Sequence, residues 1–367
     1  MRRRWIRRAS WLGGALAALA ACGGEPSAPL QVHSATIFSE PYPVDRIYRS
    51  MTGPDSVQRF AFNKAAPPEL VWITGFEAEI VAGDDEHPVS PEFMCHSNLD
   101  FLDNDEHSKL LRDEVAKTNR RLFTLSQGQM SVEFPKGFAV PVLSTETFAL
   151  TTQVLNLNPQ EEAFDVRHKT TIHYVLDREL DRPMRALYQL PLQSLVLLEG
   201  VDGFVGMPEG GTEHATSCAV GEPARDRVIP DRMGRKFAAH WVVEPGRHVY
   251  HTPVSAMMRI PGKSTTVHYI AVHLHPFAES LELRDWTTGE TLFKSHAVNR
   301  EDQIGLRHVE SFASEEGIEI HRDHGYELIA TYNNTSGEPQ DSMAVMFLYA
   351  ADPAFRKPVQ VSRQETP

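Results

Sequence analysis

Hydrophobic and polar residues alternate in short runs along most of the chain, which is the pattern of β-strands with one buried face. Turn-forming residues separate these runs at fairly regular intervals. The clearest runs are ELVWITGFEAEIV, FALTTQVLNLN, KTTIHYVLD, TTVHYIAVHLH and SMAVMFLYA. The pattern predicts an all-β chain that folds into two antiparallel, jelly-roll-like β-sandwich domains.

Breaks in this pattern divide the chain into segments. The charged stretch DRELDRPM, around residue 178, has no strand pattern and is predicted to join two halves. We expect an N-terminal sandwich over residues 31–177, a C-terminal sandwich over residues 178–353 and a tail over residues 354–367. Within the second half, the Gly-rich polar stretch from Gly206 to Arg232 is predicted to be a long surface loop.

The N-terminus carries a targeting pattern. The basic stretch MRRRWIRRASW precedes the short apolar stretch LGGALAALAA, as in a secretory signal peptide. The sequence LAAC at Leu19–Cys22 resembles a bacterial lipobox, which implies that residues 1–22 are a lipoprotein signal peptide whose Cys22 is lipid-modified and becomes the mature N-terminus. Residues 23–30 would then be a tether, and the protein would be lipid-anchored in a bacterial cell envelope, facing the periplasm or the cell surface. The alternative is an ordinary secretory peptide cleaved nearby.

Composition and charge exclude some functions. The chain has 367 residues, of which 41% are hydrophobic and 23% are charged, and this is a globular composition. Its formal net charge of −13, with no basic stripe, argues against nucleic-acid binding. No apolar run reaches the roughly 20 residues needed to span a bilayer as a helix.

A pair of histidines interrupts the strand pattern in HYIAVHLHPF. Because side chains alternate across a strand, His273 and His275 share one face, while His268 is expected on the opposite face with Ile270. The apolar positions of that opposite face form the natural core side, so the pair points away from it. Two imidazoles at this spacing can bind one metal ion, and copper accepts both imidazole nitrogen and thioether sulfur. Met343, at the start of the last strand, offers such a sulfur.

The second half also resembles a known family. The segments VVEPG, AVHLHPFAESLELRD, HGYELIATYNNT and DSMAVMFLYA follow one another as in the C-terminal domain of the copper type II, ascorbate-dependent monooxygenases. That family includes peptidylglycine α-hydroxylating monooxygenase and dopamine β-monooxygenase. The resemblance implies that His273, His275 and Met343 bind the catalytic copper that meets oxygen and substrate.

The first half is similar to the family at a second, electron-supplying copper site, but with a change. In PEFMCHSNLDF, Met94, Cys95 and His96 match the family's Met-Cys-His-His segment, whereas Ser97 replaces its second histidine. The family's third histidine lies in a Val-His-Tyr strand, and TIHYV offers His173 there. By this resemblance the second site retains two of its three ligands, so it is altered or lost.

Two alternatives remain open for this region. His168 or a nearby thiolate could complete the second site, because copper accepts both types of ligand. Cys95 could instead form a disulfide with Cys218, since exported proteins meet oxidising conditions.

Substrate positions also differ from those of the peptide-oxidising members. The arginine that the family carries two residues before its first histidine ligand is Ala271 here, and the tyrosine four residues after its methionine ligand is Phe347. Alanine cannot pair with a carboxylate, which argues against a C-terminal glycine peptide as substrate.

These observations predict an exported copper-dependent monooxygenase. It would hydroxylate a C–H bond of an unknown small substrate with O2 and an external electron donor. The altered second site keeps open a non-catalytic copper-binding lipoprotein on the same scaffold, and a third possibility is a catalytically silent interaction module.

Overall fold

The computed structural model describes residues 30–64, 67–84, 87–103, 107, 120–197, 229–230 and 234–358. Strands dominate these residues, which confirms the predicted all-β class. Within the same residues, no helix has the length and apolar character needed to cross a membrane. The predicted signal peptide and Cys22, and most of the predicted Gly206–Arg232 loop, lie outside the described residues.

The first half of the chain contributes ten strands and two short 3-10 helices among the described residues. These are β1 (His33–Phe38), β2 (Tyr42–Val44), β3 (Asp55–Phe60), β4 (Leu70–Ala82), η1 (Pro91–Phe93), β5 (Met94–Phe101), β6 (Arg121–Ser126), β7 (Ser131–Glu133), β8 (Phe138–Leu143), β9 (Phe148–Val154), β10 (Phe164–Leu176) and η2 (Asp177–Glu179). The predicted join near residue 178 falls in η2.

The second half contributes the remaining described strands. These are β11 (Arg185–Gln193), β12 (Val196–Leu197), β13 (Ile229–Pro230), β14 (Lys236–Ala238), β15 (Trp241–Val243), β16 (Gly246–Pro253), β17 (Ser264–Leu274), β18 (Ala278–Asp285), β19 (Glu290–Asn299), β20 (Leu306–Val309), β21 (Phe312–His321), β22 (Tyr326–Asn334), β23 (Gln340–Ser342) and β24 (Ala344–Ala351).

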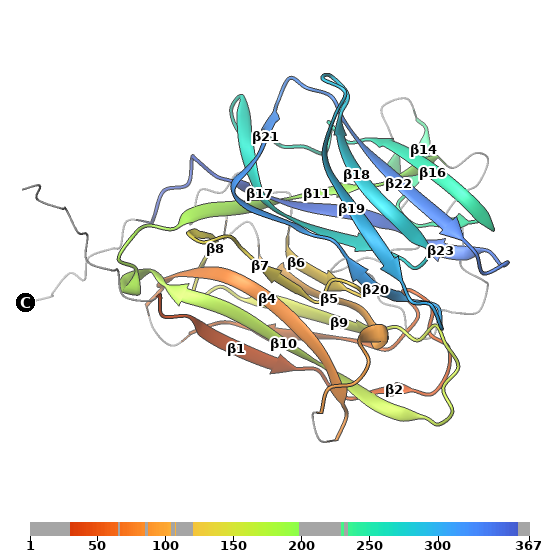
Figure 1. Ribbon diagram of the computed structural model, residues 1–367. Helices are drawn as coiled ribbons and strands as arrows, with labels where there is room; N and C mark the ends of the chain where they lie inside the picture. The colour runs from red at the N-terminus through yellow and green to blue at the C-terminus, as the bar shows by residue number, and fades with distance from the viewer. Residues whose placement is uncertain are drawn as a thin grey trace, which may run out of the picture.

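One large sheet runs through both halves, in the order β1-β10-β4-β8-β11-β24-β17-β21. Its two parts meet where β8 and β11 pair in parallel, at Phe138 opposite Arg185 and Ala139 opposite Ala186. A four-stranded sheet, β3-β9-β5-β6, packs on the first part, and a five-stranded sheet, β16-β22-β18-β19-β20, packs on the second. Figure 1 shows the first-half strands below and the blue and cyan second-half strands above them.

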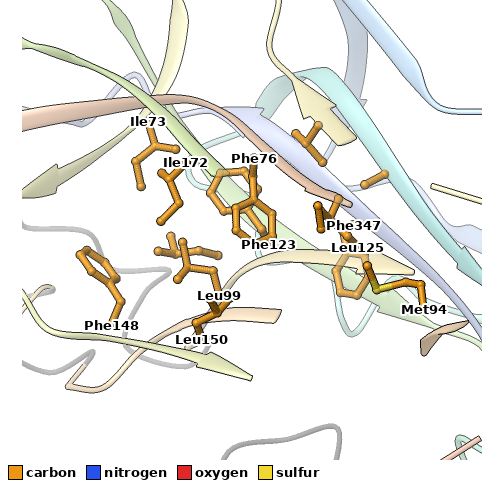
Figure 2. Close-up of a cluster of buried hydrophobic side chains, with 14 of the residues drawn as sticks. Ile73, Phe76, Met94, Leu99, Phe123, Leu125, Phe148, Leu150, Ile172 and Phe347 are labelled. Atoms are coloured by element: carbon orange, nitrogen blue, oxygen red, sulfur yellow. The ribbon is translucent and has the colours of Figure 1, made fainter. Parts of the chain in front are cut away.

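The two halves share a core as well as a sheet. Even-numbered positions of β17, such as Ile270 and Val272, pack into the second core cluster with β18 and β22. Odd-numbered positions, such as Tyr269 and Ala271, pack into the first core cluster together with Phe347 of β24. Figure 2 shows Phe347 in the same cluster as Phe76 and Phe123 of the first half.

This arrangement changes the expected surroundings of the histidine pair. The alternating pattern identified the even face of β17 as a core face, and that face is buried as expected. The odd face is buried too, because the first half of the chain packs against it. His273 and His275 therefore lie at the boundary between the two halves rather than on an open surface.

Candidate metal centre

The two histidines of the HxH pair lie together at the end of β17. His273 is 9% exposed and His275 is 5% exposed. Their ring centroids are 5.2 Å apart, with the ring planes at 89° to each other. The pair is thus compact, nearly buried and not stacked.

The chain turns sharply just after this pair. Pro276 follows His275, and Phe277 has a φ of 69°, a left-handed conformation that is rare for a bulky residue. Two asparagines hold the turn: the Phe277 N–H donates to Asn299 Oδ1 at 2.6 Å, and its carbonyl accepts from the Asn333 N–H at 2.8 Å. This fixed turn ends the strand and sets the direction of His275.

A small cavity of about 40 Å³ lies against the pair. Both halves of the chain line it: His273 and His275 come from the second half, and Ser50, Cys95 and Gln127 come from the first. A cavity needs about 10–15 Å³ on this measure to hold one water, so this one can hold an ion or a very small molecule. The space beside the pair is therefore a small pocket that both halves of the chain line.

A buried carboxylate stands behind the pair. Asp341 Oδ2 lies 3.3 Å from His275 Nδ1, and Asp341 Oδ1 lies 3.7 Å from His240 Nδ1. Burial raises the pKa of Asp341, but the imidazoles of His240 and His275 outweigh this effect and hold the pKa well below its ordinary value. Asp341 is thus charged, and its ion-pair partners are imidazoles.

His273 is kept in the form that binds metals. Burial lowers the pKa of His273 well below its ordinary value, and the neighbouring imidazoles of His275, His96 and His240 act in the same direction. Its Nδ1 is buried and has no hydrogen-bond partner within the described part of the chain. A neutral imidazole with an unused nitrogen is a ready metal ligand.

Met343 lies between β23 and β24. In the pairing of β17 with β24, His273 is opposite Val345 and Leu274 is opposite Ala344, so Met343 is the next position along. Met343 packs on the first core cluster, as do Val345 and the odd-numbered positions of β17. Its carbonyl accepts a hydrogen bond from the Tyr332 hydroxyl at 2.7 Å. Met343 therefore lies on the same side of the sheet as the pair.

A second group of buried histidines lies in the first half. His96 on β5 is 2% exposed, and His168 on β10 is fully buried. Burial lowers the pKa of His168 to about 3, and burial together with the neighbouring Arg121 and His168 lowers that of His96 to about 3. Neither ring nitrogen of His168 has a hydrogen-bond partner among the described residues, although the ring makes an edge contact with Tyr42.

The structure corrects the assignment of His173 to this second group. His168 shares the inward face of β10 with Val166 and Ile172, which belong to the first core cluster. His173 has the opposite parity and lies on the outer face, where its Nε2 is 3.1 Å from Glu77 Oε1. The histidine that β10 directs inward is therefore His168.

The neighbours of His96 have structural roles of their own. Ser97, which replaces the family's second histidine, lies with its Oγ 3.1 Å from Thr170 Oγ1 and links the two facing sheets. Cys95 is a free, buried thiol within 3.8 Å of Gln153 Oε1, and burial raises its pKa to about 12. Cys218, the disulfide partner left open by the sequence, lies outside the described residues.

Sequence reasoning missed part of the site. Asp341 stands two residues before Met343 in DSM and His240 directly precedes Trp241, and neither was predicted to belong to the site, yet Asp341 lies at ion-pair distance from both His240 and His275. In the described residues, no three His, Cys, Asp or Glu side chains are arranged to hold one metal ion. A third ligand at the pair would therefore have to be of another type, such as the thioether of Met343 that the sequence predicted.

The comparisons with known proteins give little beyond the fold. No model of a known protein family matches the chain, and no curated protein matches it. Among solved structures, a peptide-N(4)-(N-acetyl-β-D-glucosaminyl) asparagine amidase is 9% identical with a TM-score of 0.36, covering 89% of this chain and 99% of its own. PBCV-1 VP54 is 8% identical with a TM-score of 0.32, covering 90% and 98%. Matches at this level carry no functional argument.

Proposed function

We propose that this chain is an exported, lipid-anchored, copper-dependent monooxygenase that hydroxylates a C–H bond of a small substrate with O2 and an external reductant. The observation that carries the proposal is the pair of buried imidazoles, His273 and His275, against a small cavity with Met343 on the same side of the sheet. The resemblance to copper monooxygenases in the second half points to the same three residues.

The donor set suits copper. His273 and His275 would supply imidazole nitrogens and Met343 a thioether, and this mixture favours copper over hard cations such as Mg²⁺ or Ca²⁺. Copper, when bound, would supply the one-electron chemistry that O2-dependent hydroxylation needs. Burial keeps His273 neutral, so its lone pair is available without competition from protons at neutral pH.

The chain's own residues would control what reaches the centre. The cavity is small and is lined by side chains of both halves, which limits the size of a molecule that can lie beside the pair. Ala271 and Phe347, at the family's two substrate-contacting positions, are buried in the first core cluster. They cannot contact a substrate in the cavity, so this chain would recognise a different substrate from that of the peptide-oxidising members.

The buried histidines of the first half would form the electron-supplying site. His96 is the ligand retained by sequence resemblance, and His168 brings a second imidazole from β10 in place of His173. Both are neutral at physiological pH, because burial depresses their pKa values to about 3. Both are therefore in the state required of a ligand.

One observation favours a second candidate, a non-catalytic copper-binding lipoprotein. Ser97 is linked to Thr170, and His173 is paired with Glu77, so two of the family's second-site positions serve other contacts. With one intact centre, the chain would bind copper without turning over substrate.

The copper count per chain separates these functions. Purified protein would be loaded with copper, freed of excess metal and assayed by mass spectrometry of the elements, alongside His96→Ala and a His251→Ala control. His251 is an exposed histidine paired with Glu327, away from both sites. The monooxygenase proposal expects two coppers per chain and ascorbate-dependent O2 consumption in the wild type and in His251→Ala, and one copper without O2 consumption in His96→Ala. One copper in all three proteins, with no O2 consumption, would favour the binding protein, and no copper would reject both.

The lipid anchor needs its own test, because it rests on the N-terminal sequence. Mass spectrometry of the membrane fraction should find a mature chain beginning at a diacylated Cys22, and Cys22→Ser should move the protein out of that fraction. An intact Met1, or an unmodified internal Cys22, would contradict the anchor.

A further inference from the structure

Asp341 has a position that the three proposed ligands do not explain. It is nearly buried, it lies between two imidazoles, and it touches only one of the proposed ligands, His275. We propose that Asp341 is a positioning residue: its carboxylate orients His275 and makes the centre favour a divalent over a monovalent ion. This inference rests on the proposed copper site at the pair.

A pair of short strands determines the position of Asp341. β23 pairs with β15, so that Val242 lies opposite Asp341 and Trp241 lies opposite Ser342. This two-stranded ribbon carries His240 and Asp341 to the end of β17. His240 and His275 are themselves in edge contact, with ring centroids 5.7 Å apart. The pairing of β15 with β23 thus fixes the backbone that carries the Asp341 carboxylate.

The contacts of His275 define which nitrogen is free. Its Nδ1 lies 3.3 Å from both the carboxylate and the backbone carbonyl of Asp341. Its Nε2 lies 3.5 Å from the Ser50 hydroxyl, and Ser50 lines the cavity. The Asp341 carbonyl accepts a hydrogen bond from Nδ1 and the carboxylate lies at ion-pair distance from the same atom, so both favour the proton there, which leaves the Nε2 lone pair for the side of Ser50 and the cavity. A carboxylate behind a histidine ligand orients metal centres in this way.

The charge of Asp341 supports the preference for a divalent ion. Within the described part of the chain, neither Lys nor Arg lies within ion-pair distance of this carboxylate, and its partners are His240 and His275. A metal ion on the far side of the His275 ring would add positive charge near this buried carboxylate, and the Coulomb attraction is twice as large for a 2+ ion as for a 1+ ion.

The test compares Cu(II) and Cu(I) affinities in Asp341→Asn, which keeps the shape of the side chain and removes its charge. We expect the Cu(II) affinity to fall by about 10–100-fold, the usual effect of removing a residue that orients a metal ligand without binding the metal. The Cu(I) affinity, measured without oxygen against a chromophoric chelator, should fall much less. Zn²⁺, a divalent ion without redox chemistry, should follow Cu(II). The Cu(II) electron paramagnetic resonance signal should also change.

Two further variants make the result specific. Glu327→Gln removes one carboxylate from another histidine pair, that with His251, and should leave both copper affinities unchanged. Asp341→Glu keeps the charge and should retain more Cu(II) affinity than Asp341→Asn, even if both variants lose some stability.

The outcomes separate this inference from the proposed function. Equal losses of Cu(I) and Cu(II) affinity in Asp341→Asn, or no loss of either, would overturn the role of Asp341 while leaving a copper site in place. A wild-type protein that binds neither ion would instead overturn the proposed function itself.

Discussion

Strand β17 carries histidines at two places, and their surroundings differ completely. Near its start, His268 stacks on Phe138 with ring centroids 3.8 Å apart, and its Nδ1 lies 3.1 Å from the Ser314 carbonyl. At its end, His273 and His275 lie beside a cavity and a buried carboxylate. The same residue type on the same strand thus packs at one end and presents ring nitrogens at the other.

A β-bulge explains the position of His268. Parity predicts that His268 shares the even face of β17 with Ile270, but its ring contacts Phe138 of the first core cluster. In the pairings of β17 with both of its neighbours, the register shifts between Val267 and Tyr269, so His268 is the extra residue of a bulge. A bulge re-aims the side chain at its centre and resets the alternation beyond it. The comparison teaches that pairing partners, more than parity, decide what a strand histidine does.

The largest expected effect comes from removing a proposed ligand at the end of β17. His275→Ala should lower the affinity of this site for both copper ions by more than about 100-fold. This exceeds the loss typical for a residue that only hydrogen-bonds to a metal ligand. Isothermal titration calorimetry and chelator competition would measure it. His268→Ala is the matched control on the same strand, and its copper affinity should stay at the wild-type value. Equal losses in the two variants would erase the distinction between the two ends of the strand.

A smaller and more selective effect is expected for the thioether. Met343→Leu preserves side-chain volume but removes the sulfur, so the fold should tolerate it. Because thioether sulfur prefers the cuprous ion, Cu(I) affinity should fall on the order of tenfold while Cu(II) affinity changes less. X-ray absorption of the Cu(I)-loaded protein should lose its copper–sulfur scattering.

The control for the thioether is Met257→Leu. Met257 is a partly buried methionine whose sulfur accepts from the Gln193 N–H, and it does not line the cavity. If Met257→Leu and Met343→Leu change Cu(I) affinity alike, Met343 is no ligand.

The smallest effect concerns pH and the packing end of the strand. Burial lowers the pKa of His268, with the Ser314 carbonyl opposing this shift and Arg185 adding to it. Below about pH 6.5, His268 binds a proton in the unfolded chain but not in the folded chain. The free energy of unfolding therefore falls as the pH drops below that value. The loss levels off below the folded-state pKa.

Replacing this histidine should remove that proton's contribution. In His268→Phe, the free energy of unfolding should vary less steeply between pH 6.5 and 5, by at most about 1.4 kcal/mol per pH unit, the limit for one proton. Urea unfolding of metal-free protein at several pH values would measure it. A slope equal to that of the wild type would show that His268 does not titrate differently in the folded state.

The sequence predicted the strands and the common face of the pair, because both follow from local alternation. The sequence also contained an argument against His173 as a ligand, although the family resemblance pointed to that residue. His173 shares its parity with Arg167 and Lys169, which are charged, whereas His168 shares its parity with Val166 and Ile172. Within a strand, the charged face is the outer one.

Other features depend on contacts that no local pattern encodes. Asp341 and His240 meet because β15 and β23, about a hundred residues apart, form a ribbon. The odd face of β17 is buried because the first half of the chain covers it. Neither fact follows from alternation, since both require the order of the strands in the sheets.

The most direct test of the account is where copper binds in the loaded protein. A crystal of the copper-loaded full chain, with anomalous scattering recorded on both sides of the copper absorption edge, locates the metal independently of any activity. The account predicts a peak at the end of β17, between the His273 and His275 rings and next to the Met343 sulfur. Asp341 should not be bonded to this metal. A loaded crystal without a peak there, or with its only peak elsewhere in the chain, would contradict it.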